Sequence, residues 1–429
     1  MGGSITRPSP KVVDLIVHSA AQLLTLAGGP QRGARLGELG LIEDGALAAA
    51  DGRIVAVGTT PDLRARFRAR TEIDAAGRVV LPGLVDPHTH AVWVGDRAAE
   101  FEQRLAGRTY LEIMAAGGGI MSTVRQTRAA SVDQLVAETR PRLRRMLAHG
   151  TTTFEIKTGY GLETAAELRQ WTAIEQLAAE GPWTIVLTFL GAHALPAEFA
   201  GRTDEYIDLV VEEMLPAVAQ QLPRNLPAFA DVFCEEGAFT VEQSRRVLER
   251  ARALGFGLKV HADEFVGLGG TALAVELGAA SADHLVYTPE ADIAALGAGE
   301  TVAVGLPGTP FGLGQKDYTP AAKILAAGGI LALATDLNPG TTWCESMQMV
   351  IALACRNMRL TPAQAIAAAT INAARAVRLE GEVGSLEPGN LADVLVLDAP
   401  DYRHLGYRYG TNLTRTVVKA GAVVFDAGD

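Results

Sequence analysis

Short apolar runs alternate with amphipathic helical segments over most of this chain, from about residue 80 to residue 375. The segments at 131–150 and 240–255 have helical periodicity, and the second has Thr240 as a candidate N-cap and Gly255 at its end. Eight apolar runs have the character of buried parallel strands, and they span 84–90, 151–156, 183–190, 228–233, 256–262, 281–286, 301–306 and 330–336. This alternation predicts an α/β fold, a (β/α)8 TIM barrel.

The two ends of the chain have β character without a long helical period. Residues 51–58 alternate apolar and polar positions after an Asp-Gly turn, residues 384–398 combine a Pro-Gly turn with a strand, and residues 415–426 predict a hairpin. The Arg-rich segment 61–70 predicts a short solvated helix. We therefore expect a small β-sandwich domain formed by both chain termini. The expected parts are a first sandwich part at 1–80, the barrel at 81–375 and a second sandwich part at 376–429.

Composition and charge narrow the possible partners. Hydrophobic residues make up 48% of the 429 residues and charged residues 20%, which is typical of a globular chain with a sizeable core. The net charge is −11 without basic blocks, so we expect neither nucleic acid nor a membrane as partner, and no apolar run is long enough to cross a bilayer. The three cysteines form no Cys-X-X-Cys pair and the first residues contain no apolar signal segment, so we expect a cytoplasmic protein.

Histidines gather at the ends of the predicted barrel strands, where TIM barrels build their active sites. Five of the eight histidines do so: 88, 90, 193, 261 and 284. His88 and His90 are two positions apart, so on a strand they point to the same side and could hold one ion, for which imidazole favours Zn²⁺ or Fe²⁺. The alternative is a pair of unrelated histidines at the end of a strand.

Four residues near other strand ends are candidates for the same site. His261 ends a buried strand and needs a partner, either a metal ion or a backbone carbonyl. Asp336 could be the anionic ligand and could accept a proton from water, or it could cap the next segment. Glu264 could move protons and His284 could act as a base or electrophile. Their alternatives are a solvated glutamate and a structural histidine.

Taken together, these motifs resemble the metal-dependent amidohydrolase superfamily. The segments that carry the resemblance are DPHTH at 86–90, HADE at 261–264, His284, Asp336 and SLEPGNLADVLVLD at 385–398. The resemblance implies a (β/α)8 barrel with a β-sandwich built from both ends of the chain.

Further segments are similar to one branch of that superfamily, the enzymes that hydrolyse 4-imidazolone-5-propanoate to N-formimidoyl-L-glutamate in histidine degradation. They are DPHTHAVWVGDRAAEF at 86–101, Tyr110 ahead of AGGGIMSTVRQTR at 116–128, EIKTGYGL at 155–162, FLGAHALP at 189–196, ATDLNPGT at 334–341 and ATINAARA at 369–376. The resemblance implies a small-molecule substrate with a carboxylate tail, one Zn or Fe ion per subunit, and a homodimer.

Matching motif positions assigns roles to individual residues. The implied metal ligands are His88, His90, His261 and Asp336. The implied catalytic residues are Glu264, His284 and Asp336, and the branch has either Glu or Gln at position 264. The implied substrate-binding residues are Arg97, Tyr110, Tyr160, His193, Asn338, Gly340 and Thr341. Arg97 could bind the carboxylate tail, because a guanidinium pairs with a carboxylate through two hydrogen bonds. Without the family resemblance, we would interpret Arg97 as a surface arginine.

Three alternatives stay open. Binuclear amidohydrolases bridge two ions with a carboxylated lysine at the end of strand 4, but Lys157 follows strand 2, so we expect one ion; a second ion held by Glu235 or Glu236 is the alternative. A deaminase of cytosine- or guanine-like bases would use the same metal and proton-transfer residues, whereas Arg97 and Tyr160 favour a carboxylate-tailed substrate. A non-catalytic relative would keep only the barrel, yet all four ligand positions hold competent residues.

Overall fold

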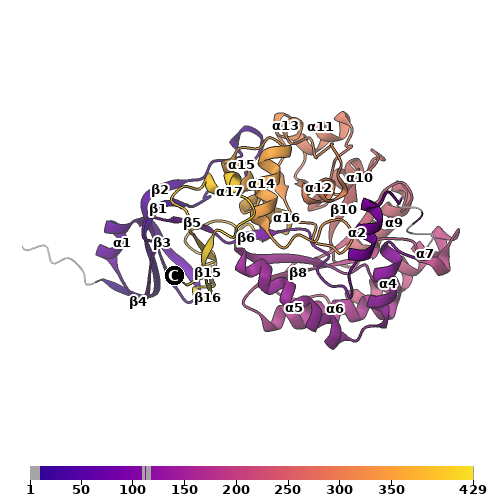
Figure 1. The fold of residues 1–429 in the computed structure, drawn as a ribbon, viewed down its shortest axis with the longest axis horizontal. Helices are drawn as coiled ribbons and strands as arrows, with labels where there is room; N and C mark the ends of the chain where they lie inside the picture. Colours follow the sequence, from indigo (N-terminus) through magenta and orange to yellow (C-terminus); the bar gives the residue numbers. More distant parts are fainter. Residues whose placement is uncertain (1–9, 109–111, 113–116, 429) are drawn as a thin grey trace, which may run out of the picture.

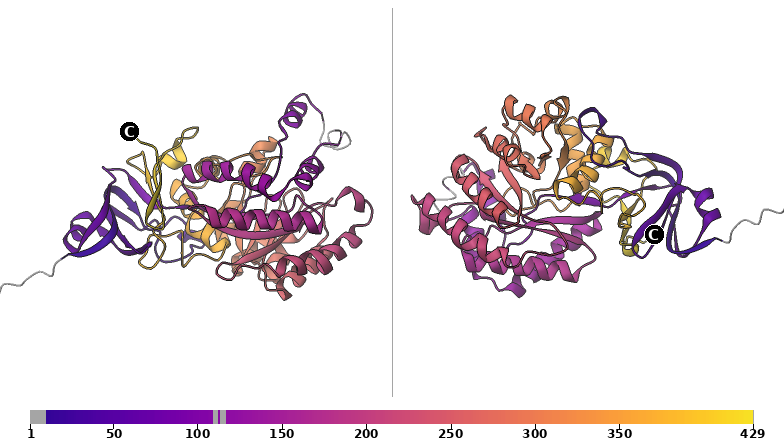
Figure 2. Two further views of the ribbon diagram at one scale, coloured as in Figure 1. Left: turned by 90° about the horizontal axis from the view of Figure 1, so that it is seen from below. Right: turned by 180° about the vertical axis from the view of Figure 1, so that it is seen from behind.

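The computed structural model describes residues 10–108, 112 and 117–428. Two sheets organise this part of the chain: a sheet from both chain ends lies at one end of the molecule, and a barrel with its helices forms the other end (Figure 1). Views from below and from behind show the same arrangement, with the C-terminus at the terminal sheet (Figure 2). Among the described helices, none has both the length and the apolar character that crossing a lipid bilayer requires.

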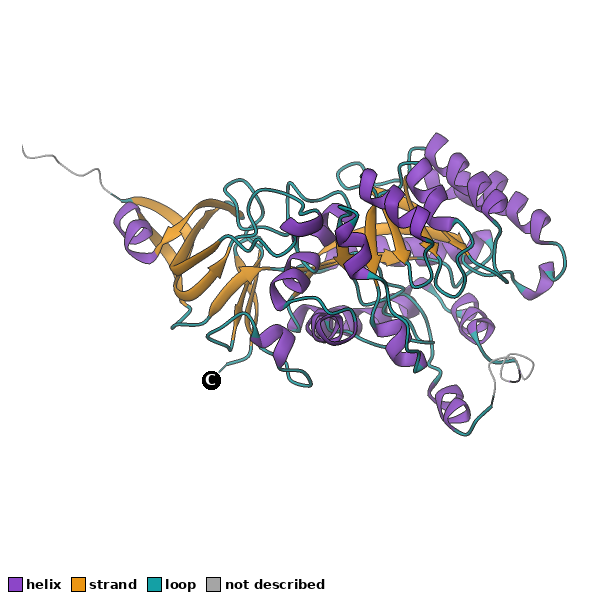
Figure 3. Ribbon diagram, turned by 90° about the horizontal axis from the view of Figure 1, so that it is seen from above, coloured by secondary structure: helices purple, strands orange, loops and turns teal. Residues whose placement is uncertain are grey.

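The described part of the chain forms eight parallel barrel strands, each paired with the next in chain order. They are β6 (Leu84–Asp86), β7 (Thr151–Lys157), β8 (Thr184–Ala192), β9 (Ala228–Cys234), β10 (Gly257–Ala262), β11 (Ser281–His284), β12 (Val302–Gly305) and β13 (Leu331–Leu333). Nearly every strand residue is buried, because helices cover the outside of the barrel (Figure 3) and side chains fill its interior. All eight strands lie within or overlap the predicted apolar runs, but β6 and β13 end at Asp86 and Leu333, so His88, His90 and Asp336 lie just beyond their strands and not in them.

Helices follow the barrel strands in the order that a (β/α)8 fold requires. They are α2 (Ala98–Leu105), α4 (Ile120–Ala129), α5 (Val132–Ala148), α6 (Thr164–Glu180), α7 (Thr203–Leu209), α8 (Leu215–Ala219), α9 (Val241–Ala253), α10 (Gly270–Glu276), α11 (Glu290–Ala298), α12 (Gly308–Leu313), α13 (Ala321–Ala326), α14 (Met347–Asn357), α15 (Pro362–Ala368) and α16 (Ile371–Ala376). Thr240 caps α9 as predicted, in a capping box with Gln243, and Gly255 follows the helix end with φ +96°.

The barrel closes at the carboxyl ends of its first and last strands. Thr89, beyond β6, forms a parallel bridge with Leu337, beyond β13. The backbone N–H of His90 donates to the carbonyl of Leu337 over 2.9 Å, and the N–H of Asp336 donates to the carbonyl of His88 over 3.1 Å. The seam of the barrel therefore consists of the segments that carry three of the four predicted metal ligands, His88, His90 and Asp336.

The terminal sheet joins the two ends of the chain through pairing of β14 with β5. Its strands are β1 (Lys11–Leu24), β2 (Leu41–Ala50), β3 (Arg53–Thr59), β4 (Phe67–Asp74), β5 (Val79–Pro82), β14 (Val394–Leu397), β15 (Thr414–Lys419) and β16 (Ala422–Asp426). Of the predicted helix at 61–70, only the first part is helical, in α1 (Thr60–Arg66). The rest begins β4, because Phe67 is buried there and the segment pairs with β1. A last short helix, α17 (His404–Tyr407), precedes β15.

Candidate metal centre and active site

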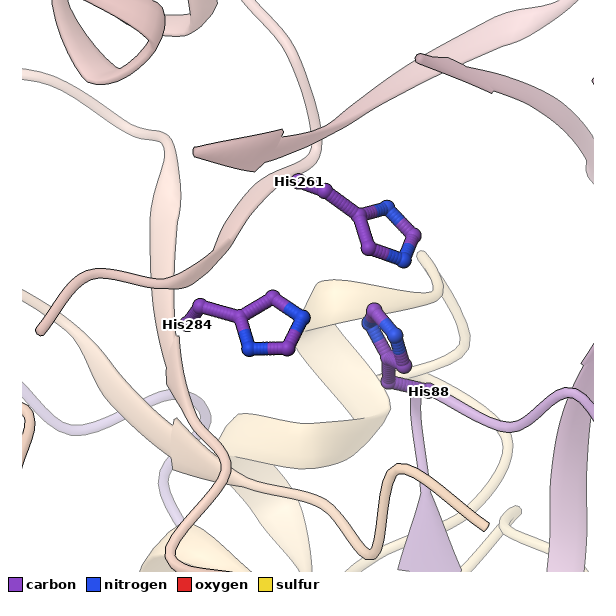
Figure 4. A group of neighbouring side chains, drawn as sticks. All are labelled: His88, His261 and His284. Carbon is purple, nitrogen blue, oxygen red and sulfur yellow. The ribbon is translucent and has the colours of Figure 1, made fainter. Parts of the chain in front are cut away.

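Imidazole nitrogens and one carboxylate converge at the carboxyl-end mouth of the barrel. His88 Nε2 and His90 Nε2 each lie 3.4 Å from Asp336 Oδ1, and His261 Nε2 lies 3.3 Å from His90 Nε2. Figure 4 shows the rings of His88, His261 and His284 turned toward a common space, with the last ring centred 5.3 Å from that of His261. All five side chains are buried. The structure thus brings together every residue predicted as a metal ligand.

Buried carboxylates orient two of these rings. His88 Nδ1 lies 2.6 Å from Asp283 Oδ2, and His261 Nδ1 lies 3.0 Å from Asp231 Oδ2. A carboxylate at Nδ1 fixes the proton on that nitrogen and directs the lone pair of Nε2 into the site. The Thr309 hydroxyl donates to Asp336 Oδ2 over 2.5 Å, which turns Oδ1 toward the histidines.

The cluster fits a divalent metal ion. His88 Nε2 is buried and forms no hydrogen bond with any described residue, although buried polar atoms normally have a partner. The Nε2 atoms of His90 and His261 face each other, and two lone pairs at that separation repel unless a cation lies between them. Three imidazoles and one carboxylate form a donor set that zinc and iron both accept.

The same surroundings give the two acid–base candidates opposite protonation states. Burial lowers the pKa of His284 well below its usual value, so the ring is neutral at neutral pH and can accept a proton. Burial raises the pKa of Glu264 well above its usual value, assisted by the charges of Asp336 and Glu235, so this carboxyl keeps its proton to a higher pH than an exposed glutamate does. The two groups are close, with His284 Nε2 3.7 Å from Glu264 Oε2.

Asp336 remains ionised despite its burial. Burial alone would raise its pKa, but the neighbouring imidazoles of His88, His90 and His284 outweigh that effect and hold the pKa well below its usual value. His284 and Asp336 also have left-handed backbones, with φ +80° and +54°. Such backbones are uncommon for residues other than glycine and cluster at functional sites.

Tyr160 and His193 lie beside the histidine cluster. The His193 ring stacks on that of His90 at 4.9 Å, and the Tyr160 ring is centred 5.3 Å from that of His193. His193 Nδ1 donates to the carbonyl of Gly159 over 2.9 Å, which leaves its Nε2 available for another partner. Both residues therefore lie next to the cluster, as predicted for substrate-binding residues.

Arg97 and the loop after β13 form the next part of the site. Arg97 Nε donates to the Thr123 hydroxyl over 2.9 Å, and an added Cβ at Gly340 would lie only 2.5 Å from Arg97 Nη1. Asn338 Oδ1 accepts from the backbone N–H groups of Gly340 and Thr341, each over 2.8 Å, so Asn338 shapes the loop. The remaining predicted substrate residue, Tyr110, lies outside the described residues.

Glu235 and Lys157, two of the residues considered for a second ion, have other partners, whereas Glu236 is exposed. Glu235 accepts hydrogen bonds from the backbone N–H groups of Phe265, Val266 and Glu236. Lys157 is buried inside the barrel between carboxylates of Glu155 and Asp231.

Asp231, Asp283 and Thr309 support the site but were not predicted from the sequence. The two aspartates interrupt apolar strands, at the centre of AFADVFC and in SADH, and a polar residue at such a position is a signal of a buried partner. The partner itself could not be identified, because it depends on which strands are neighbours.

Known proteins share both this fold and this sequence pattern. The model of the amidohydrolase family matches residues 79–424. An imidazolonepropionase from Herpetosiphon aurantiacus is 56% identical over 96% of this chain and 97% of its own length. Of the solved structures, 5-methylcytosine deaminase from Klebsiella pneumoniae has a TM-score of 0.71 at 16% identity, with 96% of this chain and 98% of that chain covered. An adenosine deaminase from Xanthomonas campestris with bound zinc has a TM-score of 0.68 at 20% identity, covering 96% and 93%; these two structures share the fold.

Proposed function

This chain belongs to the amidohydrolase family, among the imidazolonepropionases, and we propose that it hydrolyses the ring amide of 4-imidazolone-5-propanoate to N-formimidoyl-L-glutamate in histidine degradation. The observation that carries the proposal is the convergence of His88, His90, His261 and Asp336 at the barrel mouth, in a chain 56% identical to an imidazolonepropionase. The deaminase alternative has no comparable support, because the solved deaminases resemble this chain in fold alone.

We propose that these four residues hold one divalent ion, Zn²⁺ or iron. When bound, such an ion supplies Lewis-acid chemistry, which polarises the ring carbonyl and makes a water easier to deprotonate. The hydrogen bonds of Glu235 and the ion pairs of Lys157 support a single ion, since both side chains are committed elsewhere.

The proton transfers are assigned to three residues. Asp336 and His284 orient the attacking water and accept its proton, which their ionised and neutral states permit. Glu264, whose pKa is raised by burial, delivers its proton to the departing ring nitrogen. His284, once it has accepted a proton, can donate a hydrogen bond to the negative charge that develops on the carbonyl oxygen; His193, which donates through Nδ1, presents only a lone pair at Nε2.

We assign substrate binding to the residues beside the histidine cluster and in the loop after β13. Arg97 pairs with the propionate, and Tyr160 and His193 contact the ring, while Gly340 and Thr341 line the pocket on a loop shaped by Asn338. A protein of net charge −11 needs such a local cation to attract an anionic substrate. The Arg97 guanidinium lies against Gly340, in the loop assigned to the substrate pocket, and this contact supports the assignment of Arg97 to substrate binding.

The test is to incubate the metal-loaded protein with 4-imidazolone-5-propanoate and to follow the loss of its ultraviolet absorbance. Asp336→Ala and His284→Ala should each lower kcat by about two to four orders of magnitude in a folded protein, as expected for lost proton transfer. Turnover near the wild-type rate in either variant would contradict its role. Ammonia release from cytosine or guanine, without hydrolysis of the imidazolone, would favour the deaminase.

Two further expectations accompany this function. The three cysteines are free, which supports the reducing cytoplasm predicted from the sequence. We also expect a homodimer, as the resemblance implies, and sedimentation equilibrium of the purified protein checks it.

A further inference from the structure

A lysine ammonium is buried inside the barrel beneath the histidine cluster. Lys157, the last residue of β7, has no exposed side-chain surface, and its Nζ lies 2.6 Å from Glu155 Oε1 and 2.8 Å from Asp231 Oδ2. Burial alone would lower the pKa of Lys157, but the charges of Asp231 and Glu155 outweigh it and raise that pKa. Burying three charges is costly, so this cluster requires an explanation beyond packing.

One arm of the cluster leads to His261. Asp231 Oδ2, which pairs with Lys157, is also the atom 3.0 Å from His261 Nδ1. Asp231 Oδ1 accepts the backbone N–H of His261 over 3.2 Å. Lys157 thus holds the carboxylate that fixes both the ring and the backbone of this predicted ligand.

The other arm leads to the His88–His90 segment. Glu155 Oε2 accepts the backbone N–H of Thr89, between the two histidines, over 3.1 Å. The Thr89 hydroxyl donates to the carbonyl of Glu155 over 2.7 Å, and the backbone N–H of Lys157 donates to the carbonyl of Thr89 over 2.9 Å. One ammonium is therefore connected to supports of three of the four predicted ligands.

We propose that Lys157 is a positioning residue that sets the geometry of the metal site by holding Asp231 toward His261 and Glu155 toward the His88–His90 segment. Without the ammonium, the two carboxylates face each other without a counter-charge and repel, so both supports move. The proposal rests on the metal site proposed above, and it adds a residue that touches neither metal nor substrate.

The primary test replaces the ammonium by an apolar side chain of similar length, Lys157→Met. Substitution of a residue that hydrogen-bonds to a metal ligand typically lowers metal affinity by about 10–100-fold. We expect Zn²⁺ affinity, measured by competition with a chelator, to fall by about tenfold or more. We also expect the visible absorption of the Co²⁺-loaded protein to change in position or intensity, because it reports ligand geometry.

The matched control is Lys419→Met. Lys419 is also a buried lysine, with Nζ 2.5 Å from Asp393 Oδ2 and 2.8 Å from the Thr184 hydroxyl, but it lies in the terminal sheet. This control should lower stability in the same way while keeping wild-type Zn²⁺ affinity and Co²⁺ absorption. An equal loss of affinity in the control would show a general effect of destabilisation and would overturn the proposal.

A double variant separates positioning from charge balance and also serves if Lys157→Met does not fold. Glu155→Gln with Lys157→Met removes one charge of each sign. We expect it to fold and still to bind Zn²⁺ more weakly than wild type, because Asp231 has lost its partner. Wild-type affinity and absorption in either Lys157 variant would overturn the positioning role. Wild-type protein that binds no metal would instead refute the proposed function.

Discussion

The ring nitrogens that face away from the histidine cluster differ in their partners. His88 Nδ1 lies 2.6 Å from Asp283 Oδ2 and His261 Nδ1 lies 3.0 Å from Asp231 Oδ2, whereas among the described residues His90 Nδ1 has neither a hydrogen bond nor an ion pair, and the His90 ring stacks on His193. The orientation of His90 therefore depends on packing with a predicted substrate residue. The proposed metal site and the proposed substrate site therefore share this ring pair.

The Arg97 guanidinium gives the first prediction at this scale. Arg97→Ala should raise KM for 4-imidazolone-5-propanoate by about 10–100-fold, since a charged hydrogen-bonded pair is lost. KM for an analogue without the propionate should hardly change. Arg97→Lys, which keeps the charge but not the planar fork, should lie between the two. Steady-state kinetics with both substrates measure this, and equal effects on the two substrates would contradict a contact with the tail.

The second prediction concerns pH. Because burial lowers the pKa of His284 well below 6.5, the ring stays neutral and able to accept a proton until the pH falls through that lowered value. The acidic limb of the kcat/KM profile should therefore lie below pH 6.5. Glu264 donates only while protonated, so the rate should fall as the pH rises through its raised pKa, and this alkaline limb should be absent in Glu264→Gln. An acidic limb at or above pH 6.5 would contradict the assignment of His284.

The positions of the metal-site residues could be predicted from sequence because each ends an apolar run. The period of a strand placed His88 and His90 on one side, although β6 ends at Asp86 and only Thr89 between them forms a bridge, and the rule that parallel strands end at one face placed His261 and Asp336. Asp231 and Lys157 could not be paired, since their contact depends on the register of strands separated by many residues. Long-range register is a property of the closed barrel and not of any local pattern.

At the scale of elements, α6 holds the loop that carries Tyr160. Glu167 is buried and accepts from the backbone N–H groups of Gly159, Gly161 and Leu162 over 2.8–3.0 Å. Gly159 has φ +109°, where an added Cβ would also lie 2.8 Å from the carbonyl oxygen of Leu190. The loop therefore needs glycine there and a carboxylate from the helix to satisfy its N–H groups.

Glu167→Gln tests this arrangement. An amide has one acceptor oxygen where the carboxylate has two, so a backbone N–H of the loop would face the NH2 group or lose its partner, at a cost of about 1–3 kcal/mol. We expect KM to rise about tenfold, with little change in Zn²⁺ affinity. Glu180→Gln is the control, because Glu180 is exposed and lies at the far end of the same helix, where it pairs with Arg140. Unchanged KM in Glu167→Gln would show that the loop does not depend on this carboxylate.

The elements themselves were largely predictable, and the exception has a clear cause. Buried parallel strands are continuous apolar runs, so their positions are evident in the sequence. β4 is different, because most of its residues are at least partly exposed and arginines alternate along it. Its strand form comes from pairing with β1 and from the burial of Phe67, which a local helical pattern does not reveal.

At the scale of the whole molecule, the metal site lies on the seam where the barrel closes. Asp86, at the end of β6, accepts from the Thr335 backbone N–H over 3.1 Å and from its hydroxyl over 2.6 Å. Burial raises the pKa of Asp86 to about 7, so hydrogen bonds rather than a full charge hold this junction near neutral pH. An ion bound by His88, His90, His261 and Asp336 would join β6, β10 and β13 at the same point.

Metal removal should therefore loosen the closure of the barrel as well as abolish activity. A ligand that binds only the folded state at about 1,000 times its Kd stabilises it by about 4 kcal/mol. Unfolding followed by circular dichroism should show a lower midpoint after treatment with a chelator, and recovery after Zn²⁺ is returned. Asp336→Asn should weaken this dependence, because the seam keeps its backbone bonds while the anionic ligand is lost. If wild-type protein unfolded identically with and without the ion, the ion could not bridge the first and last strands, and the ligand set proposed here would be wrong.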